Sequence, residues 1–274
     1  MKKKLLLVVL FILILLVGCG NKGEEVNEYY GEGYNVTINY SHDYSYYKYE
    51  CAQLEQEQNY KNVIIIYHDA DEYKKIIGER EFRGSSDRSP FIAQILANNQ
   101  YNVVYLVQAN NGYTNALKKT TLDILEIEKS AFKEGKCNYF VGGISHGGKT
   151  AIKMMVKNQD SFDGLLLYAN TLSRRYDLSE TDKKVFCMYG SCDTVLTPKD
   201  IEDSKKYYPS NSVFYEISGG TNEGMNLLAP IPDETIIQVS NYPISPSLQM
   251  SIMANETYNY MYQNILSMEG DIND

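Results

Sequence analysis

The sequence predicts an α/β fold in which a mostly parallel sheet has helices on both faces. Short apolar runs rich in β-branched residues recur along the chain, and such runs are typical of strands buried on both sides. Segments of helical length separate most of these runs, and strands that alternate with helices favour parallel pairing. A content of 43% hydrophobic and 22% charged residues is ordinary for a globular domain and excludes a disordered chain.

The expected elements follow one another in a regular order. A tyrosine-rich segment at 34–49, broken by Ser-His-Asp at 41–43, predicts a hairpin of half-exposed strands. A strand buried on both faces is then expected at 63–67, and further strands at 103–107, 138–141, 165–168, 185–189 and 213–217. Helices are expected near 91–96, 113–134 and 148–157. Ser245 and Pro246 predict the start of a C-terminal helix, with serine as its cap and proline in its first turn.

The first residues indicate export and lipid attachment. Three lysines at 2–4 precede an apolar run at 5–17, whose 13 residues have the length of a signal-peptide core. The run ends in Leu-Val-Gly-Cys19, which resembles the lipobox of bacterial lipoproteins. The resemblance implies that residues 1–18 are a lipoprotein signal peptide and that acyl chains on Cys19 hold an extracytoplasmic protein at the cell membrane. A simple membrane anchor or an ordinary cleaved signal is the alternative.

The lipobox also sets the expected domain organisation. Residues 19–35 are polar and rich in glycine and glutamate, which predicts a flexible tether that follows the lipidated cysteine. Residues 36–274 are long enough for one domain with a large core. The cysteines of this domain allow three disulfide pairings or remain free thiols, and the sequence does not choose between them: Cys51, Cys137, Cys187 and Cys192.

The charge balance excludes some classes of partner. The chain has 35 acidic and 26 basic side chains, a net charge of −9, which becomes −12 when the three lysines of the signal peptide are removed. A nucleic-acid-binding protein would need a basic face, which this composition argues against. No C-x-x-C or other metal-ligand spacing occurs, and histidine is present only three times. We therefore expect no nucleic-acid partner, no metal and no cofactor.

A glycine cluster between the strand at 138–141 and the next helix fits two motifs. Residues 143–147 fit G-x-S-x-G, a nucleophile elbow in which glycines let a strand turn sharply into a helix and expose a serine hydroxyl. Residues 143–150 also fit G-x-x-x-x-G-K-[ST], the phosphate-binding P-loop. The strand at 165–168 does not end in the aspartate with which a P-loop enzyme binds magnesium, and nucleotides are scarce outside the cell. The elbow is therefore favoured, and a nucleotide binder is a distant alternative.

Two further turns lie where a serine hydrolase would need them. The strand at 185–189 is followed by Gly-Ser-Cys-Asp193, a G-x-x-D turn that places an acid after the serine in chain order. The strand at 213–217 is followed by the glycine-rich segment 218–224. Since both strands are expected to be parallel, these turns lie at the same edge of the sheet as Ser145.

This layout resembles that of α/β-hydrolases, in particular small bacterial enzymes of the dienelactone-hydrolase and carboxylesterase type, over residues 60–267. The resemblance implies that Ser145 is the nucleophile and Asp193 the acid of a catalytic triad. It also implies that the backbone N–H groups of His146 and Asp69 form the oxyanion hole. The implied substrate is a small ester, thioester or other acyl compound.

The chain departs from the family pattern at the catalytic base. Matching the glycines of segment 218–224 places Asn222 at the position of the triad histidine, and no histidine follows His146. An asparagine has no titratable nitrogen, so His68, Glu223 or an ordered water would have to accept the proton. Two hypotheses follow: a serine hydrolase with a degenerate triad, or a non-catalytic protein that binds a ligand or partner in the same pocket. The sequence does not decide whether residues 75–92 form a lid.

Overall fold

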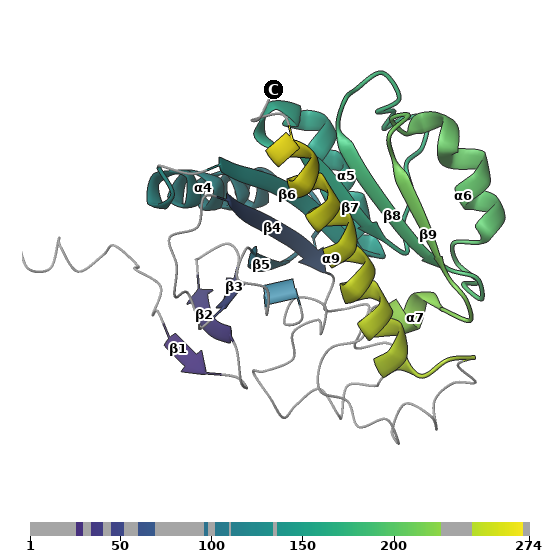
Figure 1. Ribbon diagram of the computed structural model, residues 1–274, viewed down its shortest axis with the longest axis horizontal. Helices are drawn as coiled ribbons and strands as arrows, with labels where there is room; N and C mark the ends of the chain where they lie inside the picture. Colours follow the sequence, from purple (N-terminus) through teal and green to yellow (C-terminus); the bar gives the residue numbers. More distant parts are fainter. Residues whose placement is uncertain are drawn as a thin grey trace, which may run out of the picture.

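The computed structural model describes residues 26–29, 34–40, 45–51, 60–68, 96–97, 102–109, 111–133, 136–225 and 243–270. Within these ranges the chain forms one nine-stranded sheet with the strand order β1-β2-β3-β5-β4-β6-β7-β8-β9 (Figure 1). The order places β4 and β6 in the middle of the sheet, so that the expected nucleophile turn after β6 lies at its centre.

The strands are β1 (Val26–Tyr29), β2 (Tyr34–Tyr40), β3 (Ser45–Cys51), β4 (Tyr60–His68), β5 (Asn102–Gln108), β6 (Lys136–Ile144), β7 (Gly164–Tyr168), β8 (Lys184–Gly190) and β9 (Val213–Ile217). The α-helices are α4 (Asn115–Ala131), α5 (His146–Lys157), α6 (Pro198–Ser204), α7 (Asn222–Met225) and α9 (Pro246–Gly270). Two short 3-10 helices are η2 (Gln159–Ser161) and η3 (Lys205–Tyr207). None of the helices in the described ranges is long and apolar enough to cross a bilayer.

The pairing confirms the predicted fold class. Strands β4 to β9 pair in parallel, and β1, β2 and β3 form an antiparallel ribbon whose last strand joins β5. The predicted hairpin at 34–49 is confirmed as β2 and β3, and the six strands predicted after it are all present, although β9 is mostly exposed or half-buried. Strand β1 lies within the segment that composition indicated as a tether, so the sheet begins before the predicted domain boundary at residue 36. Ser245 caps α9 as expected, because its hydroxyl accepts from the Leu248 N–H at 3.2 Å.

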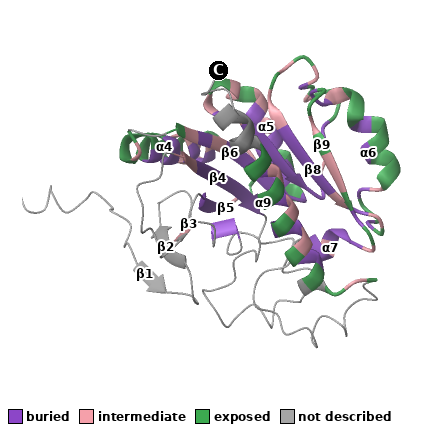
Figure 2. Cartoon of the chain, viewed as in Figure 1, coloured by how far each residue is buried: buried purple, intermediate pink, exposed green. Residues whose placement is uncertain are grey.

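Helices cover both faces of the sheet, and a separate hydrophobic cluster fills each side. Alternate residues of β4 point to opposite faces, as the pleat requires: Ile64 and Ile66 face one cluster, Val63 and Ile65 the other. The first cluster packs under α9, and the second under α4, α5 and α6. Figure 2 shows the central strands as an almost continuously buried layer. This double burial explains why the strand sequences are apolar without alternation.

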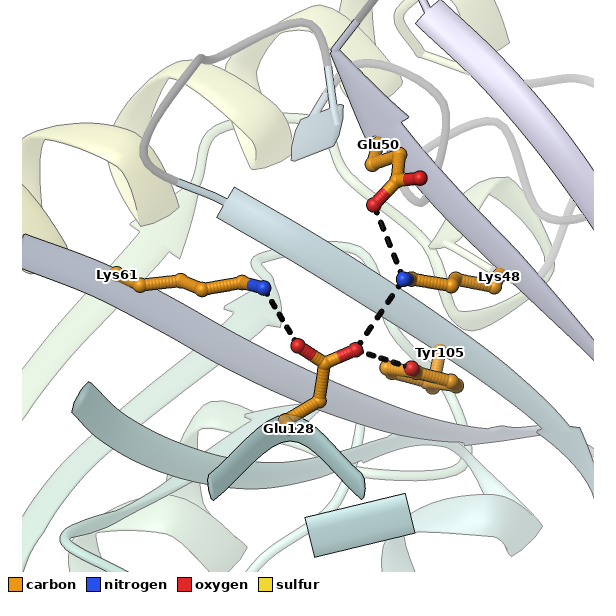
Figure 3. A network of polar contacts seen from close by, with 5 residues as sticks. All are labelled: Lys48, Glu50, Lys61, Tyr105 and Glu128. Atoms are coloured by element: carbon orange, nitrogen blue, oxygen red, sulfur yellow. Dashed lines mark hydrogen bonds and ion pairs between the residues drawn. The ribbon is translucent and has the colours of Figure 1, made fainter. Parts of the chain in front are cut away.

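A buried ionic cluster ties the antiparallel ribbon to the parallel sheet (Figure 3). Glu128 of α4 is only 1% exposed and contacts Lys61 of β4 at 2.5 Å, Lys48 of β3 at 3.3 Å and the Tyr105 hydroxyl. Lys48 also pairs with Glu50 at 3.0 Å. Burial raises the pKa of Glu128, but the charge of Lys48 and the hydrogen bonds from Lys61 and Tyr105 outweigh it, so that the pKa is lowered overall. Glu128 is therefore ionised and fully paired at neutral pH.

Candidate functional site

A sharp turn at Ser145 joins the central strand β6 to helix α5. Strand β6 ends at Ile144 and α5 begins at His146, so Ser145 alone makes the turn. Its backbone has φ 47° and ψ −115°, a conformation that a residue with a Cβ atom rarely adopts. The Ser145 N–H donates to the carbonyl of Tyr168 on β7 at 2.9 Å, and the Ser145 carbonyl accepts from the Gly148 N–H at 3.0 Å. This is the strained strand-to-helix turn that the G-x-S-x-G motif predicts.

The two glycines of the motif are required by close backbone contacts. A Cβ atom on Gly143 would lie 2.4 Å from the carbonyl group of Gly147. A Cβ atom on Gly147 would lie 2.1 Å from the carbonyl oxygen of Tyr67, on the neighbouring strand β4. Any side chain at either position would therefore push the turn off the sheet.

Asn170, at the end of β7, supports the turn from the adjacent strand. Its Nδ2 donates to the Ser145 carbonyl at 2.6 Å, and its Oδ1 accepts from the Thr171 N–H at 2.8 Å. The preceding Ala169 also has a positive φ of 49°, which turns the chain so that Asn170 faces the elbow. In the sequence, Asn170 shows only that the strand at 165–168 is not followed by a magnesium-binding aspartate. No local pattern indicates its contact with Ser145.

Asp193 lies in the turn after β8 with one carboxylate oxygen satisfied and the other free. Its Oδ1 accepts from the N–H groups of Val195 at 2.7 Å and Leu196 at 2.9 Å. Burial raises the pKa of the Asp193 carboxyl and the Glu223 charge raises it further, against the two N–H bonds and the Asn222 amide, which lower it. Within the described residues, Oδ2 is buried and has no hydrogen-bond partner. The free oxygen is the one that would orient the base of a triad.

Asn222, the first residue of α7, lies next to Asp193. Its amide group lowers the pKa of the Asp193 carboxyl, yet the two groups do not form a hydrogen bond of normal geometry. Asn222 is 6% exposed, and its Nδ2 has no partner in the described part of the chain. The structure therefore brings together Asp193 and Asn222, as expected if Asn222 occupies the position of a triad histidine.

Helix α9 fixes the backbone on which Asn222 sits. The Gln249 side chain is fully buried; its Oε1 accepts from the Thr221 N–H at 3.2 Å and its Nε2 donates to the Thr221 carbonyl at 2.7 Å. The turn after β9 is also joined to the Asp193 turn, because the Cys192 N–H donates to the Gly220 carbonyl at 2.9 Å. Gln249 was not expected from the sequence, because a glutamine in an amphipathic helix gives no sign that it will face a turn.

His68 ends strand β4 beside the elbow. The same Gly147 Cβ that would clash with Tyr67 would lie 3.0 Å from the His68 backbone nitrogen. His68 is 3% exposed, and among the described residues its Nε2 has no hydrogen-bond partner. Burial lowers the pKa of His68 to about 4, so that the imidazole is neutral at pH 7. The same burial disfavours the protonated imidazole, so His68 is a weaker base than an exposed histidine.

Some of the other predicted site residues lie within the described part of the chain and others lie outside it. His146 is exposed and is the first residue of α5. Asp69, the other expected oxyanion donor, lies outside the described residues, as do Cys19 and the segment 75–92. Among the cysteines that the structure describes with side chains, Cys137, Cys187 and Cys192 are free thiols. The described residues contain no group of three or more His, Cys, Asp or Glu that could hold a metal ion.

Comparison with known proteins decides the family. Residues 91–227, half of the chain, match the model of the alpha/beta hydrolase family. The chain belongs to this family. No curated protein sequence gives a significant match.

Solved structures of alpha/beta hydrolases share the fold. An alpha-beta serine hydrolase homologue from Coxiella burnetii is 11% identical with a TM-score of 0.51, over 83% of this chain and 99% of its own. A candidate alpha/beta hydrolase of unknown function from Agrobacterium tumefaciens is 12% identical with a TM-score of 0.51, over 87% of this chain and 97% of its own. At such low identity these similarities concern the fold alone.

The structure does not support the P-loop alternative. In this alpha/beta hydrolase, helix α5 already begins at His146, so residues 146–148, which in a P-loop would belong to the loop around the phosphate, are helical. Thr150 is buried and Lys149 is exposed. The glycines of the cluster serve the strand-to-helix turn instead.

Proposed function

We propose that this chain is an acyl hydrolase that acts on small esters, thioesters or related acyl compounds, with Ser145 as its nucleophile. The observation that supports this function best is the backbone of Ser145, which is held in a strained conformation between β6 and α5. Strain of this kind costs about 1–3 kcal/mol and is often found at catalytic positions. The N–H groups of His146 and Asp69 would bind the oxyanion, and Asp193 would hold the position of the triad acid, where Asn222 gives it no histidine to orient.

In the proposed reaction, the Ser145 hydroxyl adds to the acyl carbon, its proton passes to a base, and the leaving group departs with a proton. Asn222 cannot be that base, because an amide nitrogen is not protonated at neutral pH. His68 is one candidate, because it lies at the same edge of the sheet and its imidazole is neutral, although burial makes it a weak base. Glu223 and an ordered water are the other candidates. In a serine protease of unrelated fold, loss of the triad histidine lowers turnover about a millionfold and leaves about a thousandfold over water, so we expect slow turnover.

A fluorophosphonate probe tests the proposal, because it modifies an activated serine without needing a complete catalytic cycle. We expect slow labelling of the wild-type protein, none of Ser145→Ala, and faster labelling of Asn222→His, in which an imidazole lies beside Asp193. A His68→Gln variant shows whether His68 is the base, since labelling should then slow at least tenfold relative to the wild type. If neither the wild type nor Asn222→His is labelled, Ser145 is not a nucleophile and the proposal fails.

The second candidate function is that of a non-catalytic alpha/beta hydrolase that binds a ligand or partner in the same site. The observation that favours it is Asn222 itself, which stands beside the acid and has no nitrogen that can take the serine proton. In this case the wild type stays unlabelled while Asn222→His is labelled. That result would mean that the pocket is intact and the triad has decayed.

We also propose that the protein is anchored by lipid at Cys19 on the outer side of the cell membrane. The support is the sequence of residues 1–19, in which a basic segment and an apolar run precede a lipobox-like Leu-Val-Gly-Cys. Growth with an alkyne-bearing fatty acid tests this assignment. Label should be incorporated into the wild-type protein and not into Cys19→Ala, and equal labelling of both proteins would refute it.

A further inference from the structure

Three buried polar atoms without partners mark the edge of the sheet around Ser145. Within the described residues, four buried side-chain nitrogen or oxygen atoms lack a hydrogen bond. Three of them are His68 Nε2, Asp193 Oδ2 and Asn222 Nδ2, and the fourth, Ser212 Oγ, lies elsewhere. A buried polar atom without a partner costs about 1–3 kcal/mol, so proteins rarely keep several in one place without a use. Asp193 Oδ2 and Asn222 Nδ2 belong to neighbouring side chains, and this pair indicates a site that receives a polar group from outside the chain.

The charges at this site are negative. Asp193 is 4% exposed and forms no ion pair in the described part of the chain, and neither does Glu223 of the neighbouring turn. The two carboxylates repel each other, as the effect of Glu223 on the pKa of Asp193 shows. His68 adds no positive charge, because its burial keeps the imidazole neutral at pH 7. An active triad would place an imidazole, which becomes positively charged during catalysis, against the Asp193 oxygen that is free here.

We propose that the free oxygen of Asp193 binds a positively charged amino group of the substrate, so that the preferred substrates are small acyl compounds that carry an ammonium group close to the acyl carbon. Asn222 has a shorter side chain than histidine and carries no positive charge that would compete for the Asp193 oxygen. The Glu223 charge strengthens the attraction from the first turn of α7. This inference rests on the proposed function, because it names the substrate class of the same site.

Three ligands of similar size and different charge test the inference: n-butylammonium, butyramide and butyrate. Each is titrated into the protein at pH 8 and 300 mM salt, where attraction to the general surface charge is screened, and binding is followed by ligand-observed NMR. We expect n-butylammonium to bind at least about tenfold more tightly than butyramide, and butyrate more weakly than both. Equal affinity for the cation and the neutral amide would overturn the inference.

Three variants locate the binding site. Asp193→Asn should abolish the preference for the cation, since the amide keeps an oxygen for the Val195 and Leu196 N–H groups but carries no charge. Glu223→Gln should reduce the preference about twofold to threefold without touching that turn. Asp160→Asn, on an exposed residue of η2, is the matched control and should leave the preference unchanged. If Asp160→Asn lowers the preference as much as Asp193→Asn does, the cation is attracted by the net charge of the protein and the inference is wrong.

Failure of the cation subsite and failure of the proposed hydrolase function would give different experimental results. A protein that binds n-butylammonium through Asp193 but is not labelled at Ser145 by fluorophosphonate has the cation subsite without the nucleophile. A protein that is labelled at Ser145 but shows no preference for the cation has the nucleophile without the subsite, and the substrate class named above is then wrong.

Discussion

Because the imidazole of His68 is buried, we expect the free energy of unfolding to depend on pH by an amount that can be calculated. In the folded protein the pKa of His68 is lowered to about 4, whereas an unfolded chain has the ordinary value near 6.5. Between these values the unfolded chain binds a proton that the folded protein excludes, so stability is lost as the pH falls. Each pKa unit is worth about 1.4 kcal/mol, so the full effect is about 3 kcal/mol, of which about 2 kcal/mol is lost between pH 7 and pH 5. Because His68 is 3% exposed, solvent does not screen this free energy.

Urea unfolding of three proteins at pH 7 and pH 5, followed by circular dichroism, measures this effect. His68→Gln removes the titrating group and should lose about 2 kcal/mol less stability than the wild type between the two pH values. His146→Gln, which changes an exposed histidine beside Ser145, should behave like the wild type. If His68→Gln and the wild type lose the same stability, His68 titrates normally, and the argument that it is a buried neutral base fails.

Three further substitutions test other parts of the structure. Glu128→Gln should lower the free energy of unfolding, measured with urea, by about 3 kcal/mol, because it leaves Lys48 and Lys61 without their buried carboxylate. Glu126→Gln, on the exposed face of the same helix, is the control and should change the free energy of unfolding by less than about 0.5 kcal/mol. Asn170→Ala should slow fluorophosphonate labelling at Ser145 and lower stability by about 1–3 kcal/mol, and unchanged labelling would show that the elbow does not need this contact. Gly147→Ala should destabilise the fold by more than about 3 kcal/mol or prevent soluble expression, since its Cβ would lie 2.1 Å from a backbone oxygen, and a normal melting curve would contradict that geometry.

The parallel half of the fold could be predicted from the sequence because its strands are buried on both faces. A β-branched run such as Val63-Ile64-Ile65-Ile66 favours a strand buried on both faces, and the glycine cluster after β6 fits a strand-to-helix turn. The roles expected for Asp193 and Asn222 come from the resemblance to α/β-hydrolases, in which turns after two of the parallel strands carry the acid and the base.

Contacts between distant segments could not be predicted in this way. Glu126 and Glu128 are equivalent in a sequence read by composition, yet only Glu128 is buried, because Lys48 of β3 and Lys61 of β4 meet it from strands far away in the chain. Asn170 and Gln249 are polar residues whose partners come from other elements, so no local pattern distinguishes them from ordinary surface residues. Polar partnerships of this kind depend on tertiary packing, which hydrophobic periodicity does not encode.

The fold alone explains why the chain has Asp193, but it does not explain why the chain has Ser145. Asp193 has a structural use without any chemistry, because its Oδ1 holds the N–H groups of Val195 and Leu196 in the turn before α6. Ser145 has no comparable explanation, because a glycine would adopt φ 47° and ψ −115° with less strain. The chain instead keeps a side chain at the strained position and stabilises its carbonyl with the Asn170 amide. The strain at Ser145 is therefore better evidence for a functional hydroxyl than the presence of Asp193 is for a working triad, and labelling of Ser145 is the more decisive experiment.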